Sequence, residues 1–396
     1  MFRLRSDWLL LTLLTLLVLT QASSAIALDS TGSGIVADSG YRYNYHQSQG
    51  SGWLNLPASI YSMVGMTHVD ETVSLLLEQP LHAKSPVAAT GVTGFAPSRI
   101  IEIETPRVDT SRLPLSGSRA SHSAGTIRFY MRLAPALEFP TGLDDSRTST
   151  VDSPFWIGET EVTYELWYAV REWATSNGYR FANAGREGSH GISGQPPGDR
   201  RTEPVTMVNW RDSIVWCNAL SEMLGYEPVY THQRAVIRDS INARACDNAY
   251  AENRNGFRLP TTDEWELAAR YAGDDASHGA IEVNNVFFTP GSYASGAKAD
   301  FRDAAATQRV AWYQANTSVG TNPVASKEPN GLGLFDMSGN VWEWCYNQVG
   351  LESTLRRLKG GSLNNTAHHL QIGLSRTGNT HDAYHNRGLR LARSAF

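Results

Sequence analysis

Nine of the eleven tryptophans of this chain follow Gly125, and this distribution constrains its fold more than any other feature. A tryptophan side chain buries a large apolar area, so tryptophans spread over many segments hold irregular loops in place. The 396 residues, 41% of them hydrophobic, suffice for a large core, and length alone suggests two or three domains. We therefore expect a loop-rich domain pinned by aromatic anchors after residue 125, rather than a regular layered sheet.

Residues 1–27 have the pattern of a signal peptide. Arg3 and Arg5 supply a basic start, residues 8–20 form a short apolar stretch, and residues 25–27 (Ala-Ile-Ala) offer small side chains for cleavage. The apolar stretch is too short to span a bilayer comfortably. We predict a secreted or periplasmic protein that is not membrane-spanning and whose mature chain starts near Leu28. No cysteine lies near the cleavage point, which disfavours a lipid anchor.

Residues 28–125 are predicted to form a flexible leader and a small accessory region with a linker. Gly, Ser and Tyr dominate residues 28–60, which lack sustained periodicity. Short β-branched pieces such as residues 100–103 follow, and residues 116–123 have the Ser- and Arg-rich composition of a linker.

From Gly125 onward the pattern is that of a folded domain. Residues 128–133 and 155–160 are typical of strands. Thr163 is placed to cap a first helix, and a second helix is expected after residues 209–212. A third begins near Thr262, which lies close to capping-box spacing from residues 265–266. Beyond it, Gly- and Asn-rich segments dominate.

Charge and cysteine content exclude some classes of function. The formal net charge is −5 and no Lys/Arg-rich run occurs, so nucleic-acid binding is not expected. Cys217, Cys246 and Cys345 allow at most one intramolecular disulfide, and none of them has metal-ligand spacing. Cys217 lies in an apolar helical run, where we expect a buried side chain.

Six motifs occur in an order that resembles the formylglycine-generating enzyme (sulfatase-modifying factor) family. They occupy residues 159–163, 204–210, 257–266, 330–344, 359–362 and 388–393. The resemblance implies an α+β class with a loop-rich, C-type-lectin-like fold over residues 126–396. Fold alone does not fix function, so the residues of the site decide it.

Active members of that family bind copper through two thiols, one three residues after the serine of the Gly-Gly-Ser turn and the other five residues later. In this chain those positions are Asn365 and Leu370. Monovalent copper requires soft sulfur ligands, so no copper and no formylglycine formation are expected. The His-x3-His-x-Glu pattern of the related iron-dependent sulfoxide synthases is also absent. These substitutions favour a protein that is not an enzyme.

The resemblance also implies a structural calcium site in the loop that follows Asn330. Its ligands would be the carboxylates of Asp336 and Glu343 and the carbonyls of Gly339 and Val341. Hard oxygen donors on an irregular turn suit Ca²⁺. The alternative is a metal-free turn in which Asp336 caps locally.

The segment between the Gly-Gly-Ser turn and Gly388 resembles the variable region of proteins diversified by a retroelement, in which adenine-directed mutagenesis varies Asn codons. It is rich in interchangeable small and polar side chains, as contact surfaces are. The predicted ligand-binding residues are Asn364, Asn365, Thr366, His368, His369, Thr377, Gly378, Asn379, Thr380, His381, Tyr384, His385 and Asn386. Ordinary solvated loops of a degenerate paralogue are the alternative, and we interpret the adjacent His368 and His369 as surface residues rather than a chelating pair.

Two functions from different classes follow. The first is an exported, non-catalytic protein that binds an unknown macromolecular or cell-surface ligand with a C-terminal surface that is hypervariable if the retroelement interpretation holds. The second is a periplasmic oxidoreductase-like family member with an unrecognised substrate, akin to the branch that acts on siderophore precursors.

Overall fold

The computed structural model describes residues 116–395 except 319, together with three strands near the N-terminus. The chain divides into two units, Met1–Ile103 and Glu104–Phe396. In the first, β1 (Ile26–Leu28), β2 (Gly34–Asp38) and β3 (Tyr41–Tyr45) form an antiparallel sheet in that order.

These strands differ from the flexible leader that we expected from residue 28. The alternating tyrosines of β3 are a strand pattern too short to stand out in a Gly- and Ser-rich segment. β1 also overlaps the predicted cleavage point. The rest of the predicted signal peptide and most of the leader lie outside the described residues.

The second unit contains a five-stranded sheet with the order β14-β22-β8-β5-β4. Its strands are β4 (Arg119–Ala124), β5 (Ile127–Ala134), β8 (Phe155–Gly158), β14 (Phe257–Arg258) and β22 (Ala392–Ser394). β4 corrects our prediction that residues 116–123 are a linker and that the domain starts at 126. Its polar residues alternate in exposure along an edge strand, so their composition resembles that of a linker although they pair with β5.

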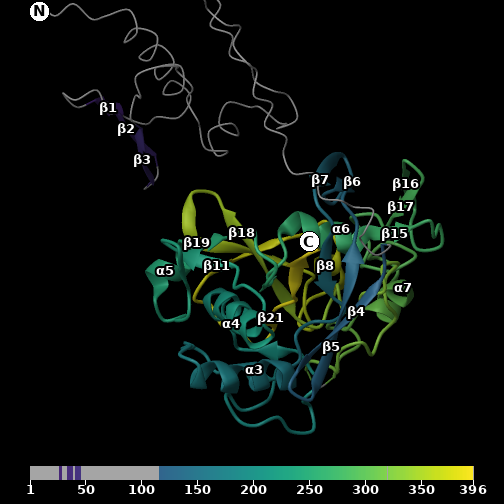
Figure 1. Cartoon of the computed structure of the whole chain (residues 1–396). Coiled ribbons are helices and arrows are strands. Elements are labelled where there is room, and N and C mark those ends of the chain that lie inside the picture. The colour runs from purple at the N-terminus through teal and green to yellow at the C-terminus, as the bar shows by residue number, and fades with distance from the viewer. Residues whose placement is uncertain (1–25, 29–33, 39–40, 46–115, 319, 396) are drawn as a thin grey trace, which may run out of the picture. The chain divides into compact units, whose positions relative to one another are not determined.

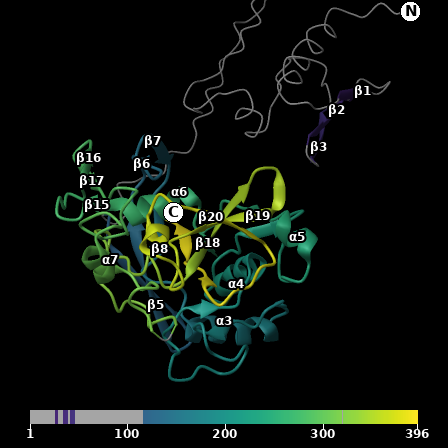
Figure 2. The ribbon, with the colours of Figure 1, turned by 180° about the vertical axis from the view of Figure 1, so that it is seen from behind.

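A four-stranded sheet with the order β20-β19-β18-β21 carries the C-terminal segment. It consists of β18 (Trp342–Val349), β19 (Glu352–Lys359), β20 (Arg376–Asn379) and β21 (Arg387–Gly388), with β21 parallel to β18. Figure 2 shows β18, β19 and β20 of this sheet from behind.

Short sheets and hairpins fill the remaining loops. The pairs are β6 (Leu137–Thr141) with β7 (Arg147–Val151), and β9 (Arg186–Glu187) with β10 (Val205–Thr206). The three-stranded sheets are β11 (Tyr230–His232), β12 (Ala235–Val236) and β13 (Tyr250–Ala251), and β15 (Tyr271–Gly273), β16 (Ile281–Val283) and β17 (Val286–Phe288).

Helices α3 (Tyr164–Ser176) and α4 (Trp210–Met223) lie side by side (Figures 1 and 2). Thr163 caps α3, as predicted, and Asn209 closes a capping box at α4. α6 (Thr262–Arg270) is capped by Thr261, not by Thr262 as the spacing suggested, because Glu264 bonds back to the Thr261 backbone. The shorter helices are α5 (Ala243–Asp247), α7 (Ala304–Val310) and the 3-10 helix η2 (Ala367–Leu370).

Of the tryptophans in the described part of the chain, five are fully buried, which confirms their predicted role as anchors. They are Trp167, Trp210, Trp216, Trp265 and Trp344. Trp167 and Trp216 stack with ring centroids 5.4 Å apart and join α3 to α4. The Trp210 indole N–H donates to the Cys345 carbonyl and so ties α4 to β18. Large rings whose N–H groups are bonded suit a fold with so much irregular backbone.

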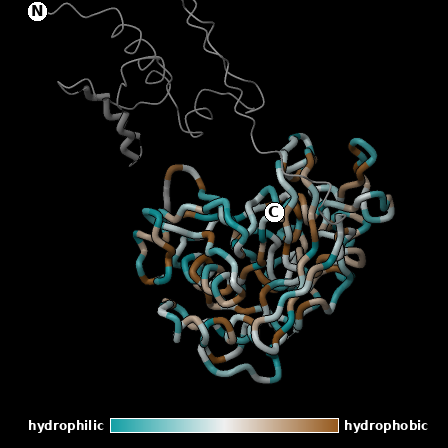
Figure 3. Tube along the Cα trace, viewed as in Figure 1, coloured by the Kyte–Doolittle hydropathy of each residue, from teal (hydrophilic) through white to brown (hydrophobic). Residues whose placement is uncertain are grey.

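None of the described helices combines the length and the apolar character needed to cross a membrane. Figure 3 shows that polar and apolar residues alternate at short intervals along the described chain.

Candidate functional site

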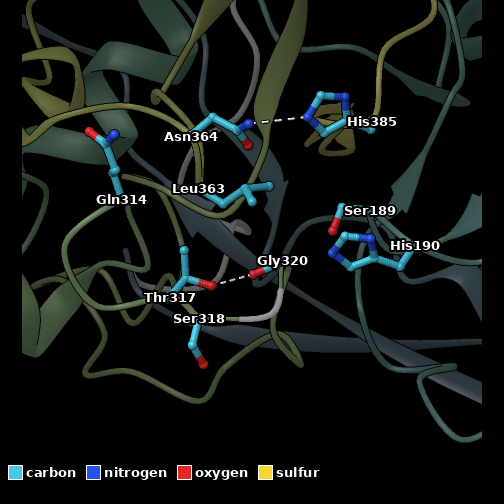
Figure 4. Close-up of a pocket in the computed structure, with 9 residues that line it drawn as sticks. All are labelled: Ser189, His190, Gln314, Thr317, Ser318, Gly320, Leu363, Asn364 and His385. Carbon is cyan, nitrogen blue, oxygen red and sulfur yellow. Dashed lines mark hydrogen bonds between the residues drawn. The ribbon is translucent and has the colours of Figure 1, made fainter.

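A cavity of about 520 Å³ opens where three loops meet (Figure 4). Its lining residues are Ser189, His190, Gln314, Thr317, Ser318, Gly320, Leu363, Asn364 and His385. They come from segments that are far apart in the sequence. Only Leu363, Asn364 and His385 belong to the C-terminal segment between the Gly-Gly-Ser turn and Gly388.

Hydrogen bonds between the loops hold the cavity walls together. The Ser189 backbone N–H donates to Thr321 Oγ1 at 2.8 Å, and the Thr321 N–H donates back to Ser189 Oγ at 3.0 Å. On the opposite wall the Gln314 N–H donates to the Asn365 carbonyl at 3.1 Å. The first two bonds depend on the hydroxyls of Ser189 and Thr321, whereas the bond between Gln314 and Asn365 is made by the backbone alone, so the side chains of Gln314 and Asn365 can change without its loss.

Two histidines give the cavity its chemistry. The Asn364 amide Nδ2 points at His385 Nε2, 3.2 Å away, so this ring nitrogen accepts the bond (Figure 4). Burial, together with the charges of Arg186 and His190, lowers the pKa of His385. His385 is therefore neutral at neutral pH. The lining presents hydroxyl, amide and imidazole groups, which suit hydrogen bonding to a polar ligand.

Most of the predicted ligand-binding residues do reach the surface. Those exposed are Asn364, Thr366, His368, Thr377, His381, Tyr384 and His385, and those half-buried are Asn365, His369, Asn379 and Asn386. They do not form one patch. Asn364 and His385 line the cavity. Thr377 instead pairs with Arg357 of β19, on the face of the sheet away from the Trp344 ring.

Gly378 and Thr380 are buried, so the prediction that they contact a ligand was wrong. A Cβ at Gly378 would stand 2.7 Å from the Trp344 ring, in the core. The Thr380 N–H donates to the Thr354 carbonyl at 2.8 Å, and its hydroxyl is buried. Alternation along β20 turns one face of this segment inward, which its uniform polarity concealed.

The positions that hold thiols in active family members have other tasks here. Asn365 Oδ1 accepts a 2.8 Å hydrogen bond from the Ser362 hydroxyl. Leu370 is fully buried and packs in a small apolar cluster with Val310 and Tyr313. The protein's own cysteines are also buried, and burial raises the pKa of all three thiols, to about 12 for Cys246. None of them lines the cavity.

The His368–His369 pair has partners that leave little room for a shared metal. His369 Nε2 lies 2.8 Å from the Arg376 guanidinium, which can only donate, so its lone pair is occupied. The His368 ring packs edge-on against Phe301. Among the described residues, no group of three or more His, Cys, Asp or Glu side chains converges as metal ligands would.

The predicted calcium loop is buried and rich in carboxylates. Asp336 adopts a left-handed backbone (φ 57°), and its Oδ2 accepts the Ala325 N–H at 2.8 Å, while its buried Oδ1 has no hydrogen-bond partner. Glu343 accepts bonds from the Trp265 indole and the Arg390 guanidinium. The unpaired Oδ1 offers a cation a ligand directly, whereas the oxygens of Glu343 would bind it in addition to the hydrogen bonds that they already accept.

Glu161 is a third buried carboxylate at this site, and our sequence analysis missed it. It accepts bonds from the Asn340 amide at 2.7 Å and the Val341 N–H at 3.0 Å. Burial, reinforced by the charges of Asp336 and Glu343, raises its pKa well above the usual range. Burial likewise raises the pKa of Asp336 to about 6. Glu161 lies in the motif at 159–163, about 175 residues before Asp336, so only the fold brings the two together.

The other residues missed by sequence reasoning are the cavity-lining ones at 189–190 and 314–320. None of them belongs to the six motifs. No local pattern marks them, because they become a site only through contact with the C-terminal loops.

Comparison with known proteins agrees with the geometry. Residues 128–395 match the family described as the sulfatase-modifying factor enzyme 1-like domain. "Chaperone protein LppX" of Paenibacillus barcinonensis is 30% identical over 269 residues, which is 61% of this chain and 81% of that protein. "Inactive C-alpha-formylglycine-generating enzyme 2" of Bos taurus is 34% identical over 150 residues, 35% of this chain and 45% of that one. The match thus spans less than half of the bovine protein.

Among solved structures, Treponema denticola variable protein 1 superposes with a TM-score of 0.54 at 28% identity. The match covers 70% of this chain and 99% of that one. These comparisons and the sheets described above confirm the predicted family and the C-type-lectin-like fold.

Proposed function

This chain belongs to the sulfatase-modifying factor enzyme 1-like family, and from that premise we propose that it is an exported, non-catalytic ligand-binding protein. Its ligand would bind at the cavity between the loops at 189–190, 314–320 and 363–385. The observation that carries the proposal is the pair Asn365 and Leu370. One is hydrogen-bonded by Ser362 and the other is buried among apolar side chains, so neither position offers a metal ligand.

The chemistry of the cavity suits recognition rather than reaction. It presents hydroxyl, amide and imidazole groups and no carboxylate or thiol. A pocket of this kind selects ligands by hydrogen-bond geometry, since a ligand group that fails to pair would leave protein groups unsatisfied. The bovine relative, whose name calls it inactive, supports the absence of catalysis.

Tyr384 would anchor a macromolecular partner at the edge of this surface. It is 47% exposed, and the Arg387 guanidinium lies 4.3 Å from its ring centroid on one face. Its carbonyl accepts a hydrogen bond from Met207, which holds the backbone in place. A tyrosine fixed in this way contributes contact area at little entropic cost.

Diversification of the C-terminal segment is a second part of the proposal. The exposed residues of this segment can change without loss of core packing, which a variable binding surface requires. Likeness to the variable protein of Treponema denticola supports it. Sequencing the genomic locus tests it: we expect a reverse transcriptase and a near-identical template repeat of the segment, and their absence would count against it.

Binding and export can be tested on the full-length protein. Hydrogen exchange with partner-bearing cells or glycan arrays should protect residues 363–385 together with 189–190 and 314–320. Asn364→Ala and His385→Ala should weaken binding by about tenfold, as expected for lost hydrogen bonds to a buried ligand. His232→Ala, a histidine outside the cavity, is the matched control. Mass spectrometry of exported protein should find an N-terminus near Leu28.

The non-catalytic part of the proposal has its own measurement. Purified protein incubated with copper and iron salts should retain no stoichiometric redox metal, and a cysteine-containing sulfatase peptide should yield no aldehyde. A stoichiometric metal or an aldehyde product would instead favour an oxidoreductase-like family member.

We also propose a structural calcium ion at Asp336, Glu343 and the carbonyls of Gly339 and Val341. Glu161, Asp336 and Glu343 face one buried arginine, Arg390, and the charge of the half-buried Lys327 also acts on Asp336, so three ionised carboxylates would still leave a net negative charge. Burying such charge is costly unless protons or a cation neutralise it. A divalent ion would supply that charge, and the free Asp336 Oδ1 offers it a ligand.

A further inference from the structure

A second cavity, of about 320 Å³, lies on the side of the molecule where β7, α6 and β19 meet. Arg147 of β7 and Arg357 of β19 both line it. Two cationic groups converging on one cavity repel each other unless an anion lies between them. This cavity shares no lining residue with the one that holds His385.

The other charges at this cavity are already matched. Glu266 accepts bonds from Lys359 Nζ at 2.9 Å and from Arg270 Nη2 at 2.8 Å, and Arg270 also pairs with Asp145. These four groups therefore balance one another. Within the described part of the chain, neither Arg147 nor Arg357 makes an ion pair.

Strand pairing fixes the backbone positions of the two arginines. Arg147 pairs with Thr141 across the β6–β7 hairpin, and its guanidinium lies over Gly142. The backbones of Gly142 and Gly373 press together so closely that a Cβ on Gly373 would overlap the Gly142 carbonyl. Arg357 lies two residues before the buried Lys359 on β19, so the two side chains face the same side of the sheet.

Hydroxyl groups complete the lining. Thr148, Thr262 and Ser375 face the cavity beside the arginines. Guanidinium forks and hydroxyl donors are the groups that proteins use to bind phosphate and sulfate oxygens.

Asp263 is the carboxylate of this lining whose negative charge would repel a bound anion. It lines the cavity and is half-buried. The charge of Asp144 also attracts Arg147, but Asp144 is exposed and does not line the cavity. Arg147, Arg357 and Asp263, the charged residues of the lining that are not matched within the Glu266 network, thus give a net charge of one positive unit.

We propose that this cavity binds the tetrahedral oxyanion of a phosphate or sulfate ester through Arg147 and Arg357. The site is independent of the cavity that holds His385, so either can fail without the other.

The test is calorimetric titration of the full-length protein with inorganic phosphate, inorganic sulfate and, separately, acetate. We expect saturable binding of phosphate or sulfate below roughly 10 mM, and the stronger of the two identifies the ester. Arg147→Gln and Arg357→Gln should each weaken it about tenfold, the effect of one lost charge-assisted bond. Asp263→Asn should strengthen it, because it removes the opposing charge.

Arg128→Gln is the matched control, since Arg128 is an exposed strand arginine that lines neither cavity. Melting temperatures establish that each variant is folded. The proposal is overturned if phosphate and sulfate fail to saturate, if acetate binds as tightly, or if Arg128→Gln weakens binding as much as the cavity variants do.

Discussion

At the scale of single residues, neighbouring positions of the C-terminal segment differ sharply in their tolerance to change. Thr377 is exposed, whereas Gly378 packs against the Trp344 ring and Thr380 is fully buried. A variable surface would therefore be interrupted by fixed positions. The burial of each side chain, and not its polarity, decides which positions can vary.

Gly378→Ala tests this division. The added methyl would stand 2.7 Å from the Trp344 ring and 2.8 Å from Arg387 Nη1, so we expect a loss of about 1–3 kcal/mol in the free energy of unfolding. His381→Ala, three residues away on the surface, should change it by less than about 0.5 kcal/mol. Urea denaturation measures both. Equal effects would mean that Gly378 is as free to vary as its neighbours.

Asp336→Asn tests the buried carboxylates. Burial raises the pKa of Asp336 in the folded state to about 6, above the unfolded value of 3.8, so the folded protein binds more protons between these pH values. Without a cation, the free energy of unfolding should therefore fall as pH rises from about 4 to about 6, by about 3 kcal/mol from this group.

The asparagine variant should lose that part of the pH dependence and tolerate the left-handed backbone at this position. Calcium should stabilise the native protein at pH 7, above the pKa of Asp336, and EGTA should reverse this. The variant should show a smaller shift in melting temperature with calcium. An unchanged calcium response would remove Asp336 from the proposed ligands.

At the scale of elements, α6 connects the site to the core. The Trp265 indole N–H donates a hydrogen bond to Glu343, and Glu266 accepts one from Lys359 of β19. The register of this helix depends on its first turn, where Thr261 and Glu264 form the capping box.

Thr261→Ala should lower the free energy of unfolding by about 1 kcal/mol, because the helix loses its N-cap hydrogen bond. Thr262→Ala is the matched control, one residue further along and without a capping bond, and should cost less. Thermal or urea unfolding distinguishes them. A larger loss of unfolding free energy in Thr262→Ala would instead support Thr262 as the N-cap, as the sequence spacing suggested.

At the scale of the whole molecule, Arg390 joins the two main sheets. Its side chain is fully buried, and it donates to the Gly158 carbonyl of β8 at 2.9 Å and to Glu343 of β18 at 2.7 Å. Arg390→Met should cost about 3–5 kcal/mol, since it leaves a buried carboxylate unpaired.

Arg393→Met provides the comparison, because Arg393 is only partly buried and bonds a single carbonyl, that of Asn255. We expect it to cost about 1 kcal/mol. Combining Arg390→Met with Glu343→Gln should recover part of the loss. Additive losses in the double variant would show that the two side chains act independently.

The sequence by itself determined the family, the loop-rich α+β fold, the Thr163 cap and the absence of thiols at positions 365 and 370. These depend on residue identity and short spacing, which are visible along the chain. It misjudged β4, whose polar edge residues are stabilised by pairing with β5.

Only the tertiary structure decided where the cavities lie, which C-terminal residues are buried, and that Glu161 faces Asp336. Ser189 and His385 line the same cavity although nearly two hundred residues separate them, and Arg147 and Arg357 line the other cavity across a similar separation in sequence. Cavities and buried charge arise from contacts between distant segments. Local sequence carries propensity and chemistry, but it does not specify which surfaces come to face each other.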